Sequence, residues 1–587
     1  MEGEPREEIR LTGIPVSPGI ARGPLIVLTD EELLIPKNKI SPDEVAAEIA
    51  RLEDALIKTR LEIIAIKEHL SAAVGEKDAS IFDAHLLVLE DSMLSGAVRK
   101  QVEIRKLCVE IVFHHLIQNY AQSMRQVEDV YLRERAADIL DVGRRVLRNL
   151  LGTKPADKYN LEVPGIVLAH DLSPSDTAML DRKKVLGFVT DIGSRTSHSA
   201  IMARSLNIPA TVGLTDASLK PKSGAEVILD GYEGVLIVNP SAQTKQQYDQ
   251  LEHKRQAIDI RLKHLRDAEA VTGDGRKIIL SANIEVPEDF PLIKQSGAEG
   301  VGLYRTEYLF MNRTGLPTED EQTEIYRQVI EAAAPHTVIF RTLDIGGDKM
   351  PDHLGPAKEI NPNLGWRAIR YTLGRRDIFH AQLRAICRAG AGTKVRVMFP
   401  MICTVEELLQ AKEALAAAMT ELRAAGTAFT EDVEIGTMIE TPAAALITDR
   451  LAKEVQFFSI GTNDLIQYTI AVDRMNEKVA YLYQPTHPAI IALIDHTVKS
   501  ARAAGIWVGV CGEMAGELLS LPLLIGLGVD ELSISFNFLP RAKAAIRSLH
   551  YDKARKLVAE LRTLNTAGEV TERLREVAER NFSELLD

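Results

Sequence analysis

The histidine at position 198 is the first residue whose surroundings suggest chemistry. A strand-like run, Val185 to Asp191, leads into a glycine- and hydroxyl-rich stretch, and a helix-like run from His198 to Leu206 follows it. His198 is therefore expected in the first turn of a helix, where unpaired backbone N–H groups and the helix dipole favour a neutral, nucleophilic imidazole and can receive an anionic phosphoryl group. The alternative is that Ser197 only caps the helix and His198 is an ordinary exposed residue. This stretch alone leaves both interpretations open.

A second group of candidate residues is scattered over the C-terminal half of the chain. Each follows the end of a short apolar run, and the group comprises Arg305, Arg341, Glu440, Asn463 with Asp464, and Cys511, with Arg474 a few residues beyond. Singly, each has an ordinary structural explanation, since an arginine is usually a surface ion pair and a buried cysteine usually packs. Stability explains poorly why all these positions carry groups that handle anions or metals.

Together these side chains predict a site for a small phosphorylated, carboxylated anion. Arg305, Arg341 and Arg474 offer planar, permanently charged forks for phosphate or carboxylate oxygens. Glu440 and Asp464 are hard oxygen donors of the kind that hold Mg²⁺. Cys511 is a possible acid if its thiol stays protonated. The set lacks an obvious nucleophile apart from that thiol, so we expect His198 to supply it and to receive the phosphoryl group.

The elements that must position these residues repeat one pattern, a short apolar run, a polar tip and a helix-like segment. The runs are Ile278–Asn283, Gly300–Tyr304, Val338–Leu343, Val395–Phe399, Glu434–Ile439, Phe457–Ile460, Trp507–Val510 and Glu531–Ile534. Eight such units predict a (β/α)8 TIM barrel, whose reacting groups lie at the C-terminal ends of the strands. A doubly wound open sheet is the competing arrangement.

The N-terminal half has a different organisation. Short strands at Ile9–Ile14 and Leu25–Leu28 precede a helical block from Ser41 to about Leu151, and strands return from Val163 to Asn239. An isolated hairpin would be marginal, so the first strands should complete the later α/β domain, with the helical block inserted in it. The predicted parts are 1–32 and 153–240 (a swivelling α/β phosphohistidine domain), 33–152 (an inserted helical bundle), 241–270 (a linking helix) and 271–587 (the barrel, with a helical C-terminal end).

Bulk composition limits the class of protein. The chain has 587 residues, 45% of them hydrophobic and 26% charged, with a net charge of −13 and four scattered cysteines. This predicts a cytoplasmic, multidomain protein without a general nucleic-acid-binding surface. The acidic first ten residues lack a secretory signal, and no apolar run is long enough to span a bilayer.

Several stretches resemble Enzyme I of the bacterial sugar phosphotransferase system. They are Ser17-Pro18-Gly19, Arg195–Leu206, Gly302–Glu307, Arg341–Lys349, Asn361-Pro362 with Gly365–Arg367, Met438–Pro442, Gly461–Leu465 and Val510–Ala515. They span essentially the whole chain in the family's order. One departure is Ser194, where the family commonly has a second glycine. A positive φ there would cost serine about 1 kcal/mol, too little to argue against activity.

The resemblance implies phosphoenolpyruvate–protein phosphotransferase activity. It assigns the phosphorylated Nε2 to His198 and phosphoenolpyruvate binding to a set of barrel residues, and it makes Cys511 the proton donor that yields pyruvate. The implied substrate-binding residues are Arg305, Arg341, Asn463, Asp464 and Arg474, and the implied Mg²⁺ ligands are Glu440 and Asp464. The helical insertion would dock the phosphocarrier protein HPr, and the barrel would form a homodimer. Because the barrel and HPr need the same imidazole, the small domain should swing between them.

Two enzyme classes and one non-enzymatic class compete with this interpretation. Phosphoenolpyruvate synthase and pyruvate phosphate dikinase share the phosphohistidine and barrel domains but need a nucleotide-binding domain, and no Gly-x-x-x-x-Gly-Lys loop occurs here. Nitrogen-related Enzyme I carries an additional N-terminal sensory domain. A non-catalytic scaffold would be expected to have lost some of the candidate residues, and all are present.

Overall fold

The chain divides into two compact units, residues 1–253 and 254–587. The computed structural model describes residues 7–28, 34–74, 81–90, 92–125, 130–153, 163–172, 184–193, 200, 203, 208–215, 217, 223–311, 313, 315–346, 359, 361–474, 476 and 478–586. Helix α9 (Ala242–His264) contains the point of division. The finer five-part division of the chain stays a prediction.

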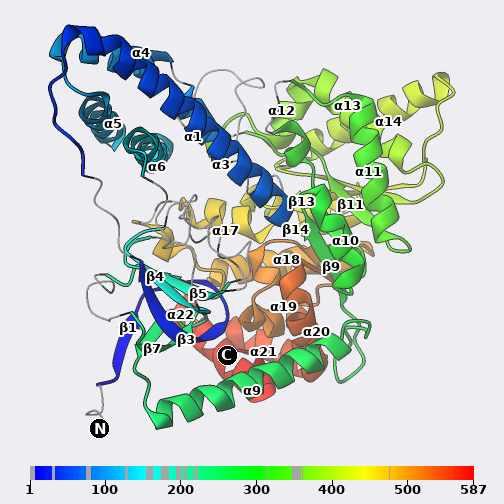
Figure 1. Ribbon diagram of the computed structural model, residues 1–587. Coiled ribbons are helices and arrows are strands. Elements are labelled where there is room, and N and C mark those ends of the chain that lie inside the picture. The colour runs from blue at the N-terminus through cyan, green and yellow to red at the C-terminus, as the bar shows by residue number, and fades with distance from the viewer. Residues whose placement is uncertain are drawn as a thin grey trace. The chain divides into compact units, whose positions relative to one another are not determined.

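The first unit contains an eight-stranded sheet that gathers strands from both ends of this half of the chain (Figure 1). Its order is β1-β8-β7-β3-β4-β5-β6-β2, with β1 Ile9–Thr12, β2 Ile14–Ser17, β3 Ile20–Leu28, β4 Gly165–Ala169, β5 Val185–Thr190, β6 Ala210–Val212, β7 Glu226–Asp230 and β8 Val235–Val238. The early strands do complete the later domain: β1 and β2 lie at opposite edges, and β3 lies between β7 and β4.

The helical block follows β3 in the chain and precedes β4. It comprises a 3₁₀ turn at Pro42–Glu44, α1 (Val45–Val74), α3 (Ile81–Leu89), α4 (Ser92–Arg105), α5 (Val109–Arg125) and α6 (Val130–Leu151). Its start follows the predicted capping pattern, since the backbone N–H of Ser41 donates to Glu44 Oε2 at 2.7 Å.

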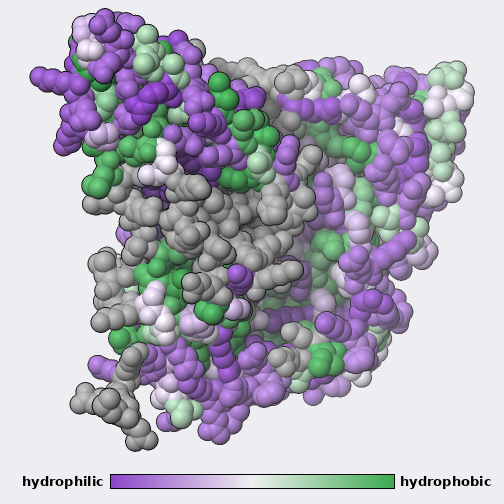
Figure 2. All heavy atoms as spheres, viewed as in Figure 1, coloured by the Kyte–Doolittle hydropathy of each residue, from purple (hydrophilic) through white to green (hydrophobic). Residues whose placement is uncertain are grey.

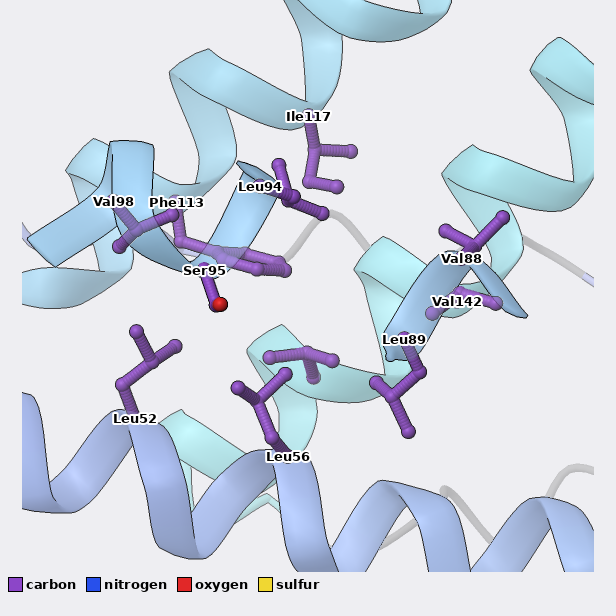
Figure 3. Close-up of a pocket in the computed structure, with 11 residues that line it drawn as sticks. Leu52, Leu56, Val88, Leu89, Leu94, Ser95, Val98, Phe113, Ile117 and Val142 are labelled. Carbon is purple, nitrogen blue, oxygen red and sulfur yellow. The ribbon is translucent and has the colours of Figure 1, made fainter. Parts of the chain in front are cut away.

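The interior of this block contains a large apolar cluster, together with buried charged side chains such as Glu110 and Asp138. Figure 3 shows Leu52 and Leu56 of α1 facing a small pocket that is also lined by side chains of α4 and α5, such as Leu94 and Phe113. Ser95 supplies the one hydroxyl group among the eleven lining residues. The pocket is therefore a gap in packing rather than a site for polar chemistry.

The second unit is a closed barrel of eight parallel strands. Its strands are β9 Ile279–Ile284, β10 Val301–Arg305, β11 Val338–Arg341, β12 Val395–Phe399, β13 Val433–Ile439, β14 Phe457–Ile460, β15 Trp507–Val510 and β16 Glu531–Ile534. All eight predicted runs are strands, and β16 pairs with β9, so the barrel prediction is confirmed and the open sheet is excluded.

Two apolar layers hold the barrel. Leu303, Met398 and Phe457 belong to a buried cluster drawn from its strands, and a larger cluster joins the strands to the surrounding helices. These helices include α11 (Glu319–Ala333), α13 (Arg376–Ala389), α14 (Val405–Ala424), α17 (Thr462–Ile470), α18 (Pro488–Ala504) and α19 (Leu521–Leu527). The predicted helical end is present as α20 (Leu539–Ser548), α21 (Tyr551–Leu561) and α22 (Ala567–Phe582).

Figure 2 shows hydrophilic residues over much of the described surface that faces the viewer, with apolar residues in smaller groups. Among the described helices, none combines the length and the hydropathy that crossing a bilayer requires.

Candidate active site

The barrel brings the scattered candidate residues of the C-terminal half to one end. Arg305 and Arg341 are the last residues of β10 and β11, Glu440 follows β13, and Cys511 follows β15. Asn463 and Asp464 lie in the first turn of α17, after β14, and Arg474 lies four residues beyond that helix. In a parallel barrel these positions share the C-terminal face, where active sites form.

Arg341 is held between two carboxylates. Its guanidinium lies 3.0 Å from Glu307 Oε1 and 2.9 Å from Asp344 Oδ2. Burial by itself would lower the pKa of Arg341, but the charges of Glu307 and Asp344 outweigh it and raise the pKa above its ordinary value. The positive charge is therefore permanent and its direction is fixed.

A further arginine, Arg367, joins this group through the same aspartate. It donates to Asp344 Oδ1 at 3.0 Å and to the Tyr468 hydroxyl at 3.0 Å, and it lies 3.8 Å from Asp464 Oδ2. Burial opposes the charge of Arg367, yet Asp344 and Asp464 raise its pKa. The Nε atoms of Arg341 and Arg367 are buried and have no hydrogen-bond partner in the described part of the chain.

Glu440 and Asp464 form an acidic pair beside these arginines. Glu440 is buried, and its Oε1 accepts a hydrogen bond from the Met401 backbone N–H at 2.5 Å. Burial raises the pKa of Glu440, and the negative charges of Asp464 and Asp344 raise it further. Two carboxylates that repel each other in this way are suited to sharing a cation.

The main chain after β14 passes close to the Glu440 carboxylate. Residue 461 is glycine, and a Cβ atom there would lie 2.9 Å from Glu440 Oε2. No cluster of three or more His, Cys, Asp or Glu side chains that could hold a metal ion occurs among the described residues. Two carboxylates, those of Glu440 and Asp464, are a donor set that fits Mg²⁺, which takes few protein carboxylates and completes its shell with substrate oxygens and water.

Arg305 lies on the neighbouring strand and pairs with Glu285. Burial lowers the pKa of Arg305, and the positive charge of Arg341 lowers it further. Two guanidinium groups close enough to act on each other make a strong receptor for an anion that carries more than one negative charge.

Cys511 lies next to this charged group and is buried in the apolar layer of the barrel strands. Its Sγ donates to the Ile460 carbonyl oxygen at 3.7 Å. Burial raises the pKa of the Cys511 thiol to about 11. The thiol therefore stays protonated near neutral pH, as a proton donor must.

Asn463 and Arg474 both meet Glu513. The Asn463 amide donates to Glu513 Oε1 at 3.0 Å, and the Glu513 backbone N–H donates to Asn463 Oδ1 at 2.9 Å. Arg474 Nη1 lies 3.8 Å from the same carboxylate. The structure thus brings these two predicted residues together through an exposed glutamate.

His198 and Ser194 lie outside the described residues. Of the predicted helix, Ala200 and Ala203 are described, and both are helical and buried. The strand predicted to lead into the stretch is present as β5. The role of His198 stays a prediction.

The sequence interpretation gave no role to five residues that shape the barrel site: Glu285, Glu307, Asp344, Arg367 and Glu513. Glu307, Asp344, Arg367 and Glu513 all lie within stretches that carried the resemblance, so a signal was present. Their pairing with the arginines depends on neighbouring strands, which sequence spacing does not reveal.

Comparisons with known proteins define the class first. Three family profiles cover most of the chain: the PEP-binding domain of PEP-utilising enzymes at residues 260–551, their N-terminal domain at 12–135 and their mobile domain at 161–234. The chain therefore has the three domains of a PEP-utilising enzyme.

Full-length relatives define the family. The chain is 45% identical to phosphoenolpyruvate-protein phosphotransferase of Geobacillus stearothermophilus over 97% of this chain and 98% of the relative. It is 44% identical to the Bacillus subtilis protein of that name, over 95% and 98%. The Haemophilus influenzae protein is 42% identical, over 96% and 98%. The chain belongs to the phosphoenolpyruvate-protein phosphotransferase family, and these matches favour that activity over a synthase or dikinase.

Proposed function

We propose that this protein moves the phosphoryl group of phosphoenolpyruvate to His198 and then to the phosphocarrier HPr, releasing pyruvate, as the first step of sugar phosphotransferase transport. The observation that carries the proposal is the charged group at the barrel end, where Arg341 and Arg367 share Asp344 beside the Glu440–Asp464 pair, in a chain of this family. Its acceptor nitrogen makes the enzyme a phosphotransferase with a nitrogenous acceptor group.

The proposed chemistry assigns each side chain one task. Arg305, Arg341, Asn463 and Arg474 bind the phosphate and carboxylate of the substrate, and the neutral His198 imidazole attacks phosphorus through Nε2. The bond between phosphorus and the enol oxygen breaks as the N–P bond forms. The carbon end of the enolate then takes the Cys511 proton, which gives pyruvate, and solvent returns a proton to the thiolate.

PEP-utilising enzymes of this family generally need Mg²⁺, and we assign its ligands here to Glu440 and Asp464. The ion would neutralise charge that develops on the phosphoryl and enolate oxygens. Support for the assignment comes from the two carboxylates themselves, since burial and then the charge of Asp464 raise the pKa of Glu440, and a cation would relieve this repulsion.

For HPr, we propose docking on the helix pair α1 and α3. Arg60 pairs with Glu90 at 2.9 Å and Lys67 pairs with Asp83 at 2.5 Å, so the two helices run side by side. Apolar side chains remain exposed on this pair: Ile57 and Leu61 at 60% and Leu87 at 70%. Exposed apolar residues rimmed by charges are typical of a protein-binding surface.

Self-association through the barrel unit completes the proposal, giving a cytoplasmic homodimer. This unit exposes large apolar side chains that include Leu446 at 63% and Tyr481 at 71%. Sedimentation of the wild type and of Tyr481→Glu would test the idea, because a charge at a buried dimer contact should shift the equilibrium toward monomer.

Labelled phosphoenolpyruvate tests the central step. With Mg²⁺ and no nucleotide, we expect acid-labile label on the wild type and none on His198→Gln, followed by transfer of the label to HPr. Label that needs ATP, or that persists in His198→Gln, would contradict the proposal. Leu87→Glu should keep the self-labelling and weaken transfer to HPr, which separates the docking surface from the chemistry.

A further inference from the structure

Gln382 is a fully buried amide in α13 with three hydrogen-bond partners. Its Oε1 accepts from the Leu343 backbone N–H at 2.9 Å, and its Nε2 donates to Thr306 Oγ1 at 3.0 Å and to the Tyr326 hydroxyl at 3.2 Å. One acceptor and both donor hydrogens are therefore in use. The sequence interpretation did not single this residue out.

These bonds reach both strands that end in the proposed substrate arginines. Thr306 directly follows Arg305, and its hydroxyl donates to the Arg341 carbonyl oxygen at 3.0 Å. Leu343 lies two residues after Arg341 and directly before Asp344, which pairs with Arg341. A single side chain thus bonds to the Thr306 hydroxyl beside Arg305 and to the main chain just after Arg341.

The network is anchored outside the barrel as well. The Tyr326 hydroxyl on α11 donates to Gln322 Oε1 at 3.2 Å, so the amide is held from two helices, α11 and α13. Its anchors are buried, and no solvent competes for their hydrogen bonds.

Stability alone is a weak reason for an amide at this position. The inward face of α13 is otherwise apolar, with Phe379, Leu383 and Ile386 fully buried. A hydrophobic side chain could be buried there without any hydrogen-bond partner, whereas a buried amide whose hydrogen bonds are all formed adds little net stability. The amide instead ties both strand ends to one point on α13, in addition to the direct contacts between them, which are the Thr306–Arg341 hydrogen bond and the Arg341–Glu307 ion pair.

We propose that Gln382 is a positioning residue that sets the separation of the Arg305 and Arg341 guanidinium groups, and through it the affinity for phosphoenolpyruvate. The inference rests on the proposed function, because it takes these two arginines as substrate ligands. Small displacements of binding groups have large effects on such sites.

Binding measurements on the full-length chain test this role. Phosphoenolpyruvate is titrated calorimetrically with Mg²⁺ in a His198→Ala background, which prevents transfer, and the melting temperature is measured without ligand. Gln382→Met keeps the length of the side chain and removes its hydrogen bonds, and it should raise Kd about tenfold. Tyr326→Phe removes one anchor and should raise Kd by roughly two- to threefold.

Thr430→Val is the matched control. Thr430 is buried near the opposite end of the barrel, where its hydroxyl donates to the Thr393 carbonyl oxygen at 2.7 Å. The Thr430→Val substitution should lower the melting temperature and leave the Kd for phosphoenolpyruvate unchanged. A Gln382→Met protein that melts lower but binds with wild-type affinity would overturn the inference. Failure of the His198→Ala parent to bind phosphoenolpyruvate would instead count against the proposed function.

If Gln382→Met does not fold, Gln382→Glu decides the question. A protonated glutamic acid can donate to Thr306, whereas an ionised one only accepts and would draw the Thr306 hydroxyl away from the Arg341 carbonyl. The ratio of its Kd to that of the parent should therefore rise with pH. A ratio that stays at one across pH 5–8 would overturn the inference.

Discussion

Arginines occur at both ends of the barrel, and the two ends use them differently. At the N-terminal end, Arg396 of β12 donates to Glu434 at 2.6 Å, and its guanidinium lies 4.9 Å from the ring centre of Trp507. Trp507 stacks in turn on Phe457, with 4.6 Å between ring centres. At the C-terminal end, Arg341 and Arg367 share Asp344, and each has a buried Nε without a hydrogen-bond partner among the described residues.

The difference separates two uses of one residue type. An aromatic face covers Arg396, which leaves its guanidinium little to offer a ligand. Arg341 and Arg367 are held by carboxylates instead, and beside them burial, together with the charges of Asp464 and Asp344, raises the pKa of Glu440. The first arrangement stabilises the barrel, and the second keeps charge available for a substrate.

Arg341→Lys should give the largest effect. Lysine keeps the charge but cannot donate to Glu307, Asp344 and a substrate oxygen with one planar fork, so we expect kcat/KM for phosphoenolpyruvate to fall by about 10²–10³-fold. Steady-state kinetics would measure it. The same exchange at Arg396 is the control, and an equal loss there would remove the distinction between the two ends.

Cys511→Ala should give the second-largest effect, because it removes the proposed proton donor and should slow pyruvate formation by about 10²-fold. Since burial raises the pKa of this thiol to about 11, the wild-type rate should show no thiol titration between pH 7 and 9. Cys387→Ala is the matched control, a buried thiol of α13 whose pKa burial raises to about 12. A rate that declines with a midpoint near 8.5, the ordinary thiol value, would contradict the assignment.

Trp507→Ala tests the N-terminal end. It removes the stack on Phe457 and the cover over Arg396, so the free energy of unfolding should fall by about 2 kcal/mol. Denaturant titration would measure this loss. Well below the melting temperature, kcat/KM should stay within about twofold of the wild type; a tenfold drop would mean that this end also shapes the site.

Arg396→Lys should have the smallest effect. A lysine keeps the ion pair with Glu434 and part of the contact with Trp507, so we expect a loss of about 0.5 kcal/mol in unfolding free energy and unchanged kinetics. A loss above about 2 kcal/mol would show that the planar group itself is essential to the stack.

Much of the barrel follows from its sequence pattern. Most strands are short runs in which nearly every residue is buried, as in β14 and β16, although the first half of β13 is only partly buried. Parallel strands buried on both faces lack the polar–apolar alternation of half-exposed strands. The run ends also placed Arg305, Arg341, Glu440 and Cys511 at one face, because every strand of a barrel points the same way.

The remaining features depend on contacts between distant segments. Nothing in the spacing shows that Arg367 reaches Asp344, or that Gln382 on a surrounding helix bonds to two strand ends. Sequence spacing does not predict the strand order of the first unit either. Strands β1 and β2 are neighbours in sequence, but they lie at opposite edges of the sheet, where they pair with β8 and β6.

The place of the helical block in the chain has a consequence for engineering. Strands β3 and β4 pair in parallel, with Leu25 opposite Ile166 and Leu28 opposite Ala169, so the block leaves at one end of this strand pair and returns at the other. Topologically it is an enlarged crossover connection. A tight turn could not replace it, because a parallel crossover needs a dozen or more residues. A minimal version of this domain would need a single substitute helix there. If the block docks HPr as proposed, replacing it should change the docking partner, and the replacement must also suit sheet residues such as Val167 and Phe188, which share a buried cluster with the block.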